Sequence, residues 1–295
     1  MNQVAAPTTS PASSITYTES GGHRLAIRDW AAPAGAPRGM VLVVHGLGEH
    51  SGRYERLAAP LIEWGFRVRG FDLYGHGLSA GPRGGMDTES RFLDDLAHIH
   101  RLTVSELPAG MPLILIGHSF GGLISSHAVA QKVVKPDALV LSSPALDAGL
   151  NPFQKLLIAT LPRVVPNLRV GTGFQLERLT HDKAIVEACR NDPLAHQRIA
   201  ARLARFLAEA GPDTVSKAPS WTVPTLLMWA GADSFVAPAG SSAFAAKAPA
   251  SVVQSQEFPA LYHEIFNESP ELAAPVFATL RAWLGRTISA SNQPA

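Results

Sequence analysis

The 295-residue chain has a single cysteine, Cys189, and no long block of one charge. One cysteine cannot form an intramolecular disulfide, so the sequence does not require an oxidising compartment. Its 25 basic and 24 acidic residues give a formal net charge of +1, which provides no electrostatic reason to bind a polyanion. We therefore expect a small or neutral substrate and no nucleic-acid partner.

Long apolar runs are also missing from the sequence. No segment has the roughly 18 to 20 consecutive apolar residues that span a bilayer. Residues 1–13 are small and polar, with neither the positively charged start nor the apolar stretch of a secretory signal. We expect a disordered tail over these residues and a cytoplasmic protein that meets membranes, if at all, at their surface.

Apolar runs of strand length alternate with helix-like segments through the first half of the chain. Residues 40–46, MVLVVHG, are typical of a strand covered on both faces, and similar runs follow at residues 66–72, 111–117 and 137–145. Residues 15–30 instead have the pattern of an antiparallel hairpin. The sequence therefore predicts an α/β fold with a mostly parallel central sheet flanked by helices.

This alternation stops at residues 147–218, which have helical patterns and no convincing strand. Strand patterns return at residues 222–231, TVPTLLMWAG. The simplest organisation is one α/β core, formed by residues 14–146 and 219–286, with a helical cap inserted between its two parts.

The first part of the predicted cap is rich in Leu, Ile and Val, as in FQKLLIATLPRVVPNLRV. A cap helix must bury one apolar stripe on the core, and this burial explains most of these side chains. Those that face the cleft instead would receive an acyl chain, and residues near Phe153 and Leu157 are the candidates for substrate binding. A lipid ester and transient contact of the cap with a membrane surface would suit such a cleft.

The segment from Gly117 to Gly121, GHSFG, fits the pattern G-x-S-x-G between an apolar strand and a helix. A sharp turn there strains the backbone at Ser119, and the flanking glycines leave room for it. The positive end of the helix favours a developing oxyanion. Ser119 could instead cap the helix only, but the strand and helix around it favour a nucleophile.

A serine nucleophile needs a base, and the base needs an acid that orients it. In α/β hydrolases the serine comes first along the chain, the acid (Asp or Glu) second and the base (His) third. His263 lies in a loop after the last predicted strand, whereas His127 lies on the serine's own helix. His181 and His196 lie in the predicted cap. His263 is therefore the candidate base.

Asp233 follows the predicted strand of residues 222–231 in a short loop, which makes it the candidate acid. Asp147 also follows a strand and is the second choice. Other aspartates lie within or beside predicted cap helices: Asp182, Asp192 and Asp213.

An oxyanion hole requires two backbone N–H donors, one of them from the residue after the nucleophile, here Phe120. Leu47, in the glycine-rich loop HGLGEHSGRY, is the candidate for the second donor. No cluster with metal-ligand spacing accompanies His45 or His50, so His45 is interpreted as structural and no metal is expected. The segment DLYGHGLS lacks the spacing of a nucleotide loop, so no cofactor is expected.

Three segments, HGLGEHSGRY, DLYGHGLS and GHSFGG, together resemble the α/β-hydrolase superfamily, and within it the monoacylglycerol lipase and lysophospholipase-like group. The resemblance extends from about Ser14 to Leu284 and implies a helical cap over the active site. It also implies the roles that the pattern predicts. Ser119 would be the nucleophile, Asp233 the acid and His263 the base, and Leu47 and Phe120 would be the oxyanion donors. The group more often has methionine where this chain has Phe120.

These patterns predict a serine carboxyl-ester hydrolase that acts through an acyl-enzyme on monoacylglycerol, lysophospholipid or a similar lipid ester. The same scaffold could act on short-chain, aryl or synthetic esters, or on amides or thioesters. A ligand-binding protein without catalysis is a further alternative, since a fold does not determine a function. No pattern indicates an oligomeric state.

Overall fold

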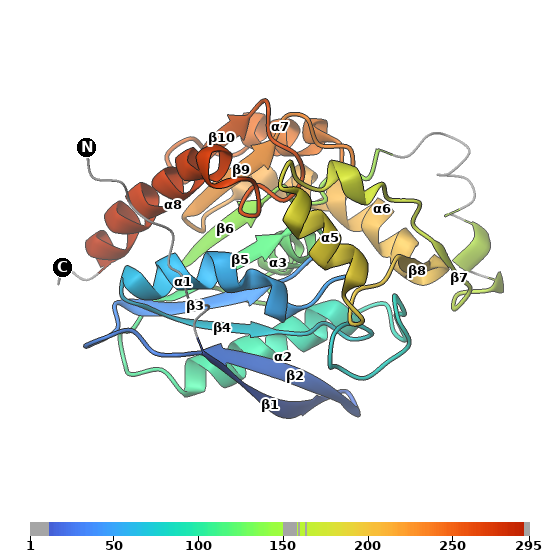
Figure 1. Ribbon diagram of the computed structural model, residues 1–295, viewed down its shortest axis with the longest axis horizontal. Helices are drawn as coiled ribbons and strands as arrows, with labels where there is room; N and C mark the ends of the chain where they lie inside the picture. The colour runs from blue at the N-terminus through green and yellow to red at the C-terminus, as the bar shows by residue number, and fades with distance from the viewer. Residues whose placement is uncertain (1–11, 150–157, 159, 163, 292–295) are drawn as a thin grey trace.

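The computed structural model describes residues 12–149, 158, 160–162 and 164–291. Their centre is an eight-stranded sheet with the strand order β1-β2-β4-β3-β5-β6-β9-β10 (Figure 1). The strands of this sheet are β1 (Ser13–Ser20), β2 (His23–Trp30), β3 (Gly39–Val44), β4 (Phe66–Phe71), β5 (Leu113–His118), β6 (Ala138–Ser142), β9 (Thr225–Ala230) and β10 (Val253–Phe258). Within this sheet, as far as the chain is described, only the β1–β2 and β2–β4 pairs are antiparallel. The predicted fold class, a mostly parallel sheet flanked by helices, is confirmed.

The central strands are buried on both faces, as their continuous apolar runs predict. Along β3, Met40, Leu42 and Val44 belong to one hydrophobic cluster and Val41 and Val43 to another, because successive side chains point to opposite faces. The helices are α1 (Glu55–Glu63), α2 (Arg91–Ser105), α3 (Ser119–Ala130), α5 (Lys183–Asn191), α6 (Ala201–Lys217), α7 (Pro238–Lys247) and α8 (Pro270–Ser291). Helices α1 and α8 cover one face, and α2 and α3 cover the other (Figure 1).

Helix α3 is the most enclosed of these helices for its length. Its residues Phe120 to Val129 are all buried, since it packs against β5, β6, α2 and α6. A helix that is apolar around its whole circumference belongs in the interior. The helix that begins at Ser119 is therefore held in a rigid, buried environment.

Residues 147–218, which we call the cap segment, lie between β6 and β9. They contain α5, α6, the short helix η2 (Leu176–Arg178) and an antiparallel pair of strands, β7 (Arg169–Gly171) and β8 (Arg198–Ala200). The expectation that this segment has no strand is therefore wrong. Three-residue strands are too short to show an alternating pattern, and their pairing depends on a partner almost thirty residues away.

Some expectations concern residues outside the described part of the chain. The substrate-binding candidates Phe153 and Leu157 are among these, as is the predicted tail up to residue 11, and β1 begins at Ser13. In the described part, no helix is both long and apolar enough to cross a membrane.

Candidate active site

Ser119 stands at the sharp turn between β5 and α3. Its φ of 53° lies in the left-handed region, which an L-residue other than glycine rarely adopts. A Cβ added to Gly117 would lie 2.6 Å from the Gly121 carbonyl oxygen, and one added to Gly121 would overlap the Val44 and His45 carbonyls. Both flanking glycines are thus required for the turn that presents Ser119 at the end of the sheet.

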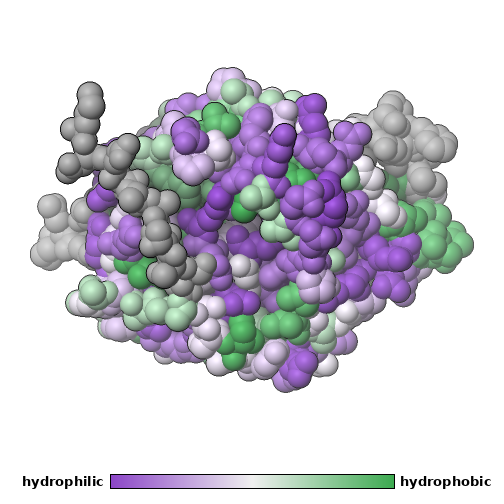
Figure 2. All heavy atoms as spheres, viewed as in Figure 1, coloured by the Kyte–Doolittle hydropathy of each residue, from purple (hydrophilic) through white to green (hydrophobic). Residues whose placement is uncertain are grey.

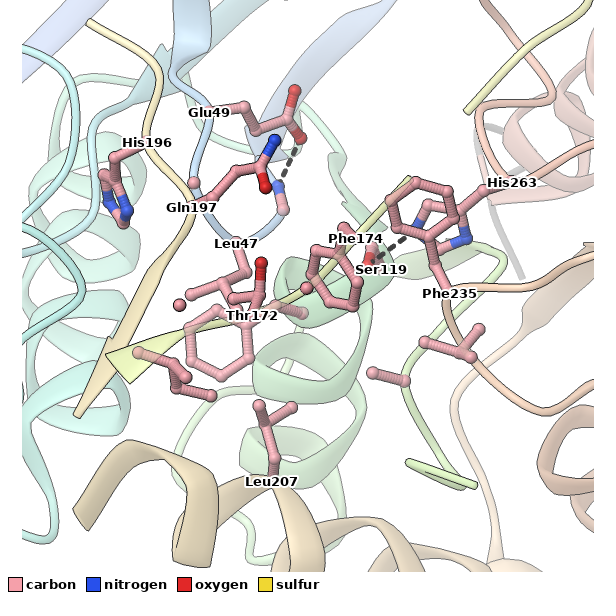
Figure 3. Close-up of a pocket in the computed structure, with 18 of the residues that line it drawn as sticks. Leu47, Glu49, Ser119, Thr172, Phe174, His196, Gln197, Leu207, Phe235 and His263 are labelled. Atoms are coloured by element: carbon pink, nitrogen blue, oxygen red, sulfur yellow. Dashed lines mark hydrogen bonds between the residues drawn. The ribbon is translucent and has the colours of Figure 1, made fainter. Parts of the chain in front are cut away.

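The three candidate residues of the predicted nucleophile, base and acid lie within hydrogen-bond distance of one another. The Ser119 hydroxyl donates to Nε2 of His263 over 2.8 Å (Figure 3). Nδ1 of His263 in turn donates to Oδ2 of Asp233 over 2.6 Å. Asp233 follows β9 and His263 follows β10, so the carboxyl ends of the parallel strands bring these side chains together.

The surroundings of His263 favour its charged form. Burial disfavours the imidazolium, but the Asp233 carboxylate outweighs this cost, and the pKa of His263 is raised. Burial alone would raise the pKa of Asp233, and its contact with His263 lowers that pKa instead. Nearby His118 is the opposite case, because burial and the charge on His263 lower its pKa to about 4. The site therefore pairs a carboxyl group whose ionised form is favoured with an imidazole whose charged form is favoured.

The two candidate oxyanion donors come from the residue after Ser119 and from the loop after β3. Phe120 is the second residue of α3, so its N–H is among those that have no carbonyl partner within the helix. Leu47 lies in the loop after β3 and, like Ser119, lines a cavity that is described below (Figure 3). The N–H of Leu47 meets no acceptor among the described residues. The ring of Phe120, where the resembling group more often has methionine, packs edge-on against Phe92 in the core.

Glu49 is a buried carboxylate that sequence reasoning did not single out. Its Oε1 accepts hydrogen bonds from the Gly46 N–H at 2.5 Å and the Tyr54 hydroxyl at 2.6 Å. Its Oε2 lies 3.0 Å from the guanidinium of Arg53, which also makes a bidentate ion pair with Glu264. Although burial raises the pKa of Glu49, Arg53 and nearby histidines lower it to about 2. This network fixes the loop that carries Leu47 and ties it to the residue after His263.

The cap segment is attached to the same loops. His50 lies 2.7 Å from Asp192, and the His196 N–H donates to the Gly48 carbonyl over 2.8 Å. On the other side, buried Glu268 accepts hydrogen bonds from the Thr180 hydroxyl and the His181 N–H. Three of the aspartate and histidine positions set aside as catalytic candidates, His181, Asp192 and His196, thus hold the cap segment against the core.

The remaining alternatives are hydrogen-bonded to groups other than Ser119. His127 contacts Thr214 of α6, and Oδ1 of Asp147 accepts from the Gly149 N–H. His45 donates to the Gly46 carbonyl and accepts from the Leu73 N–H, which joins two loops of the core. No group of histidine, cysteine and carboxylate side chains in the described residues could hold a metal ion.

A cavity of about 800 Å³ opens at Ser119 and His263 beneath the cap segment (Figure 3). Most of its wall is apolar and is contributed by the cap segment, α6 included, with Ile158, Leu161, Leu168, Val170, Ala204 and Leu207. A smaller polar region is lined by Glu49, Arg53, Arg190, Asp192 and Glu264. Ser119 therefore lies between a mainly apolar part of the cavity and a polar part.

Comparison with known proteins agrees with this geometry. The profile of the family described as serine aminopeptidase, S33, matches residues 35–270. The chain is 31% identical over 256 residues to a monoacylglycerol lipase of Mycolicibacterium smegmatis, covering 86% of this chain and 90% of that protein. It is 30% identical over 248 residues, 83% of this chain, to an uncharacterized abhydrolase domain-containing protein of Dictyostelium discoideum, but spans only 26% of that longer protein.

Solved structures give the same result. The monoacylglycerol lipase of Paleococcus ferrophilus superposes with a TM-score of 0.79 at 32% identity, covering 89% of this chain and 99% of that one. A soluble variant of the monoglyceride lipase of Saccharomyces cerevisiae, in complex with a substrate analogue, has a TM-score of 0.85 at 25% identity, covering 97% and 98%. The chain therefore belongs to the serine aminopeptidase S33 family of α/β-hydrolases and is a serine hydrolase.

Proposed function

We propose that this protein hydrolyses the ester bond of monoacylglycerols or closely similar neutral lipid esters through an acyl-enzyme on Ser119. The observation that carries the proposal is the hydrogen-bonded chain from Ser119 through His263 to Asp233 at the mouth of a mainly apolar cavity of about 800 Å³. The lipases named among the relatives support the same substrate class.

In the proposed reaction, Nε2 of His263 takes the proton of the Ser119 hydroxyl as Oγ attacks the ester carbonyl. The N–H groups of Leu47 and Phe120 stabilise the oxyanion that forms on the carbonyl oxygen. The imidazolium then protonates the leaving alcohol, which departs as the acyl-enzyme forms. Water repeats the sequence, and a carboxylic acid is released with Ser119 restored.

The polar end of the cavity favours a neutral headgroup over a phosphate. Arg53 is the central cation there, and it is already paired with Glu49 and Glu264. Arg190 is likewise paired, with Glu177 and Glu187. A phosphate would therefore meet two buried carboxylates and no unengaged arginine among these groups, whereas the hydroxyls of a glycerol could hydrogen-bond to the same carboxylates.

Rates on a matched substrate series test this proposal. With one acyl chain throughout, we expect kcat/KM on the monoacylglycerol to exceed that on the lysophosphatidylcholine by at least about tenfold, because burying a charge without a partner costs more than about 1.4 kcal/mol. The corresponding fatty amide and a short p-nitrophenyl ester complete the series. Equal rates on the two lipids, or faster cleavage of the amide, would contradict the assignment.

We also propose that residues 147–218 act as a cap that contacts a membrane surface transiently while lipid enters. Val164, Leu168 and Val170 of this segment expose 80%, 47% and 52% of their surfaces, and apolar residues gather at this end of the molecule (right in Figure 2). Under this proposal the enzyme is cytoplasmic and reaches lipid at the membrane periphery.

Flotation with phosphatidylcholine vesicles measures this contact. The double variant V164D/V170D should float with vesicles less than the unsubstituted protein, while V104D, which charges an equally apolar and 46% exposed site on α2, should not change flotation. Equal flotation of all three proteins would rule out the contact.

A further inference from the structure

Phe235 is joined to two of the three residues of the proposed relay. Its backbone N–H donates to Oδ1 of Asp233 over 2.8 Å, which leaves Oδ2 for His263. Its ring lies against the imidazole of His263 with a centroid separation of 5.0 Å and an angle of only 10° between the planes (Figure 3). This is the geometry of an offset-stacked pair.

A second aromatic ring from the cap segment contacts Phe235 on the cavity side. Phe174 lies after β7, and its ring centroid is 4.8 Å from that of Phe235 at an angle of 43°. Both rings line the cavity beside Ser119 (Figure 3). Among the described residues, the Phe235 ring contacts both the imidazole of His263 and the ring of Phe174, whereas no ring contact joins Phe174 to His263 directly.

The stacked ring has an electrostatic consequence for the reaction. The face of an aromatic ring carries negative charge, and a cation within about 6 Å of its centroid is attracted to it. In the proposed reaction His263 is neutral at the start and positively charged after it has taken the serine proton. The Phe235 face is therefore attractive to the charged form of His263, which is the form that the reaction generates.

We propose that Phe235 is a positioning residue that holds the imidazole of His263 in line with Ser119 and stabilises its imidazolium form. Phe174, in contrast, shapes the cavity for substrate and does not act on His263. Both statements rest on the proposed ester hydrolysis, but the first is a statement about one imidazole and can be measured without turnover.

Other charged or titratable groups also face His263, and the test must separate them from Phe235. Asp233 is the main one, Glu264 and Glu49 add negative potential, and burial opposes all three. The ring of His118 lies 4.8 Å away at 52°, and is neutral near pH 7 because burial and His263 lower its pKa to about 4. None of these groups is altered when the Phe235 side chain is changed.

The pH dependence of kcat/KM gives a readout that a purely structural role would not produce. Its acid limb reports the base of the free enzyme, and activity is lost as pH falls and His263 becomes protonated. In F235L the imidazolium loses the aromatic face, so the acid limb should move to lower pH while kcat on the plateau falls about threefold to tenfold. F235Y keeps an aromatic face and should retain the wild-type limb.

F174L is the matched control, since it removes the neighbouring ring and leaves the stacked pair in place. We expect its acid limb to coincide with that of the wild type and its KM to rise. Thermal unfolding verifies that each variant is folded, and the downfield proton resonance of the bond from Nδ1 of His263 to Asp233 verifies that the bond persists in F235L.

Titration of the His263 ring by NMR measures the same quantity without substrate. A lower pKa of His263 in folded F235L, but not in F235Y or F174L, supports the proposal even if no ester in the series is cleaved, in which case the proposed function alone fails. An unchanged titration and acid limb in F235L, or a tyrosine variant that behaves as the leucine variant does, would overturn it.

Discussion

The variant S119A is expected to hydrolyse esters about a thousandfold to a millionfold more slowly than the unsubstituted protein. The alanine removes the oxygen that forms the acyl-enzyme, and water in the remaining site has no comparable activation. The fold should be unchanged. Within the described residues the Ser119 hydroxyl is hydrogen-bonded to His263 alone, and the turn itself depends on Gly117 and Gly121. Steady-state rates on a monoacylglycerol, with the thermal midpoint, give both quantities.

A serine of the same helix provides the control for this variant. Ser126 is buried two turns further along α3, and its hydroxyl donates to the Gly122 and Leu123 carbonyls of its own helix. S126A should therefore keep nearly the full rate. Turnover by S119A close to that of S126A would mean that another group attacks the ester.

The variant E49A is expected to lose about 3 to 5 kcal/mol of its free energy of unfolding, because it breaks a buried ion pair from one side. The change leaves the Gly46 N–H and the Tyr54 hydroxyl without their shared acceptor and removes one of the two carboxylates of Arg53. Urea denaturation measures the loss. Since Gly46 precedes Leu47, the loop should also shift and the catalytic rate should fall.

An exposed glutamate distinguishes this effect from a simple loss of charge. Glu63, at the end of α1, is exposed, and E63A should change stability by no more than about 0.5 kcal/mol. If E49A were as stable as E63A, the Glu49 network would not be what fixes the loop of Leu47.

The core of the fold could be predicted because its strands carry their own signal. A run such as VLVV in β3 is apolar at every position, and only a strand covered on both faces accommodates it. Strands β7 and β8 carry no such signal, since Arg169–Gly171 and Arg198–Ala200 become strands only by pairing with each other. These two strands can therefore be assigned only from the three-dimensional structure, which shows their pairing.

The same distinction applies to the site. Ser119, Asp233 and His263 could be proposed from chain order and from their places after predicted strands, and the structure brings them together. Glu49 and Glu268 could not, because nothing in the sequence shows that either carboxylate is buried against partners from distant segments. The one sequence feature that pointed to the Glu49 ion pair was the spacing of four residues between Glu49 and Arg53 within HGLGEHSGRY. The stacking of Phe235 on His263 has no counterpart in the sequence pattern.

Labelling with a fluorophosphonate tests the central claim most directly, since the reagent reacts with an activated serine and leaves a stable adduct. The account predicts one adduct per chain, located by peptide mass spectrometry on Ser119, absent from S119A and strongly reduced when His263 is replaced by alanine. An adduct on a different residue, or no adduct on a protein that hydrolyses the ester, would contradict it.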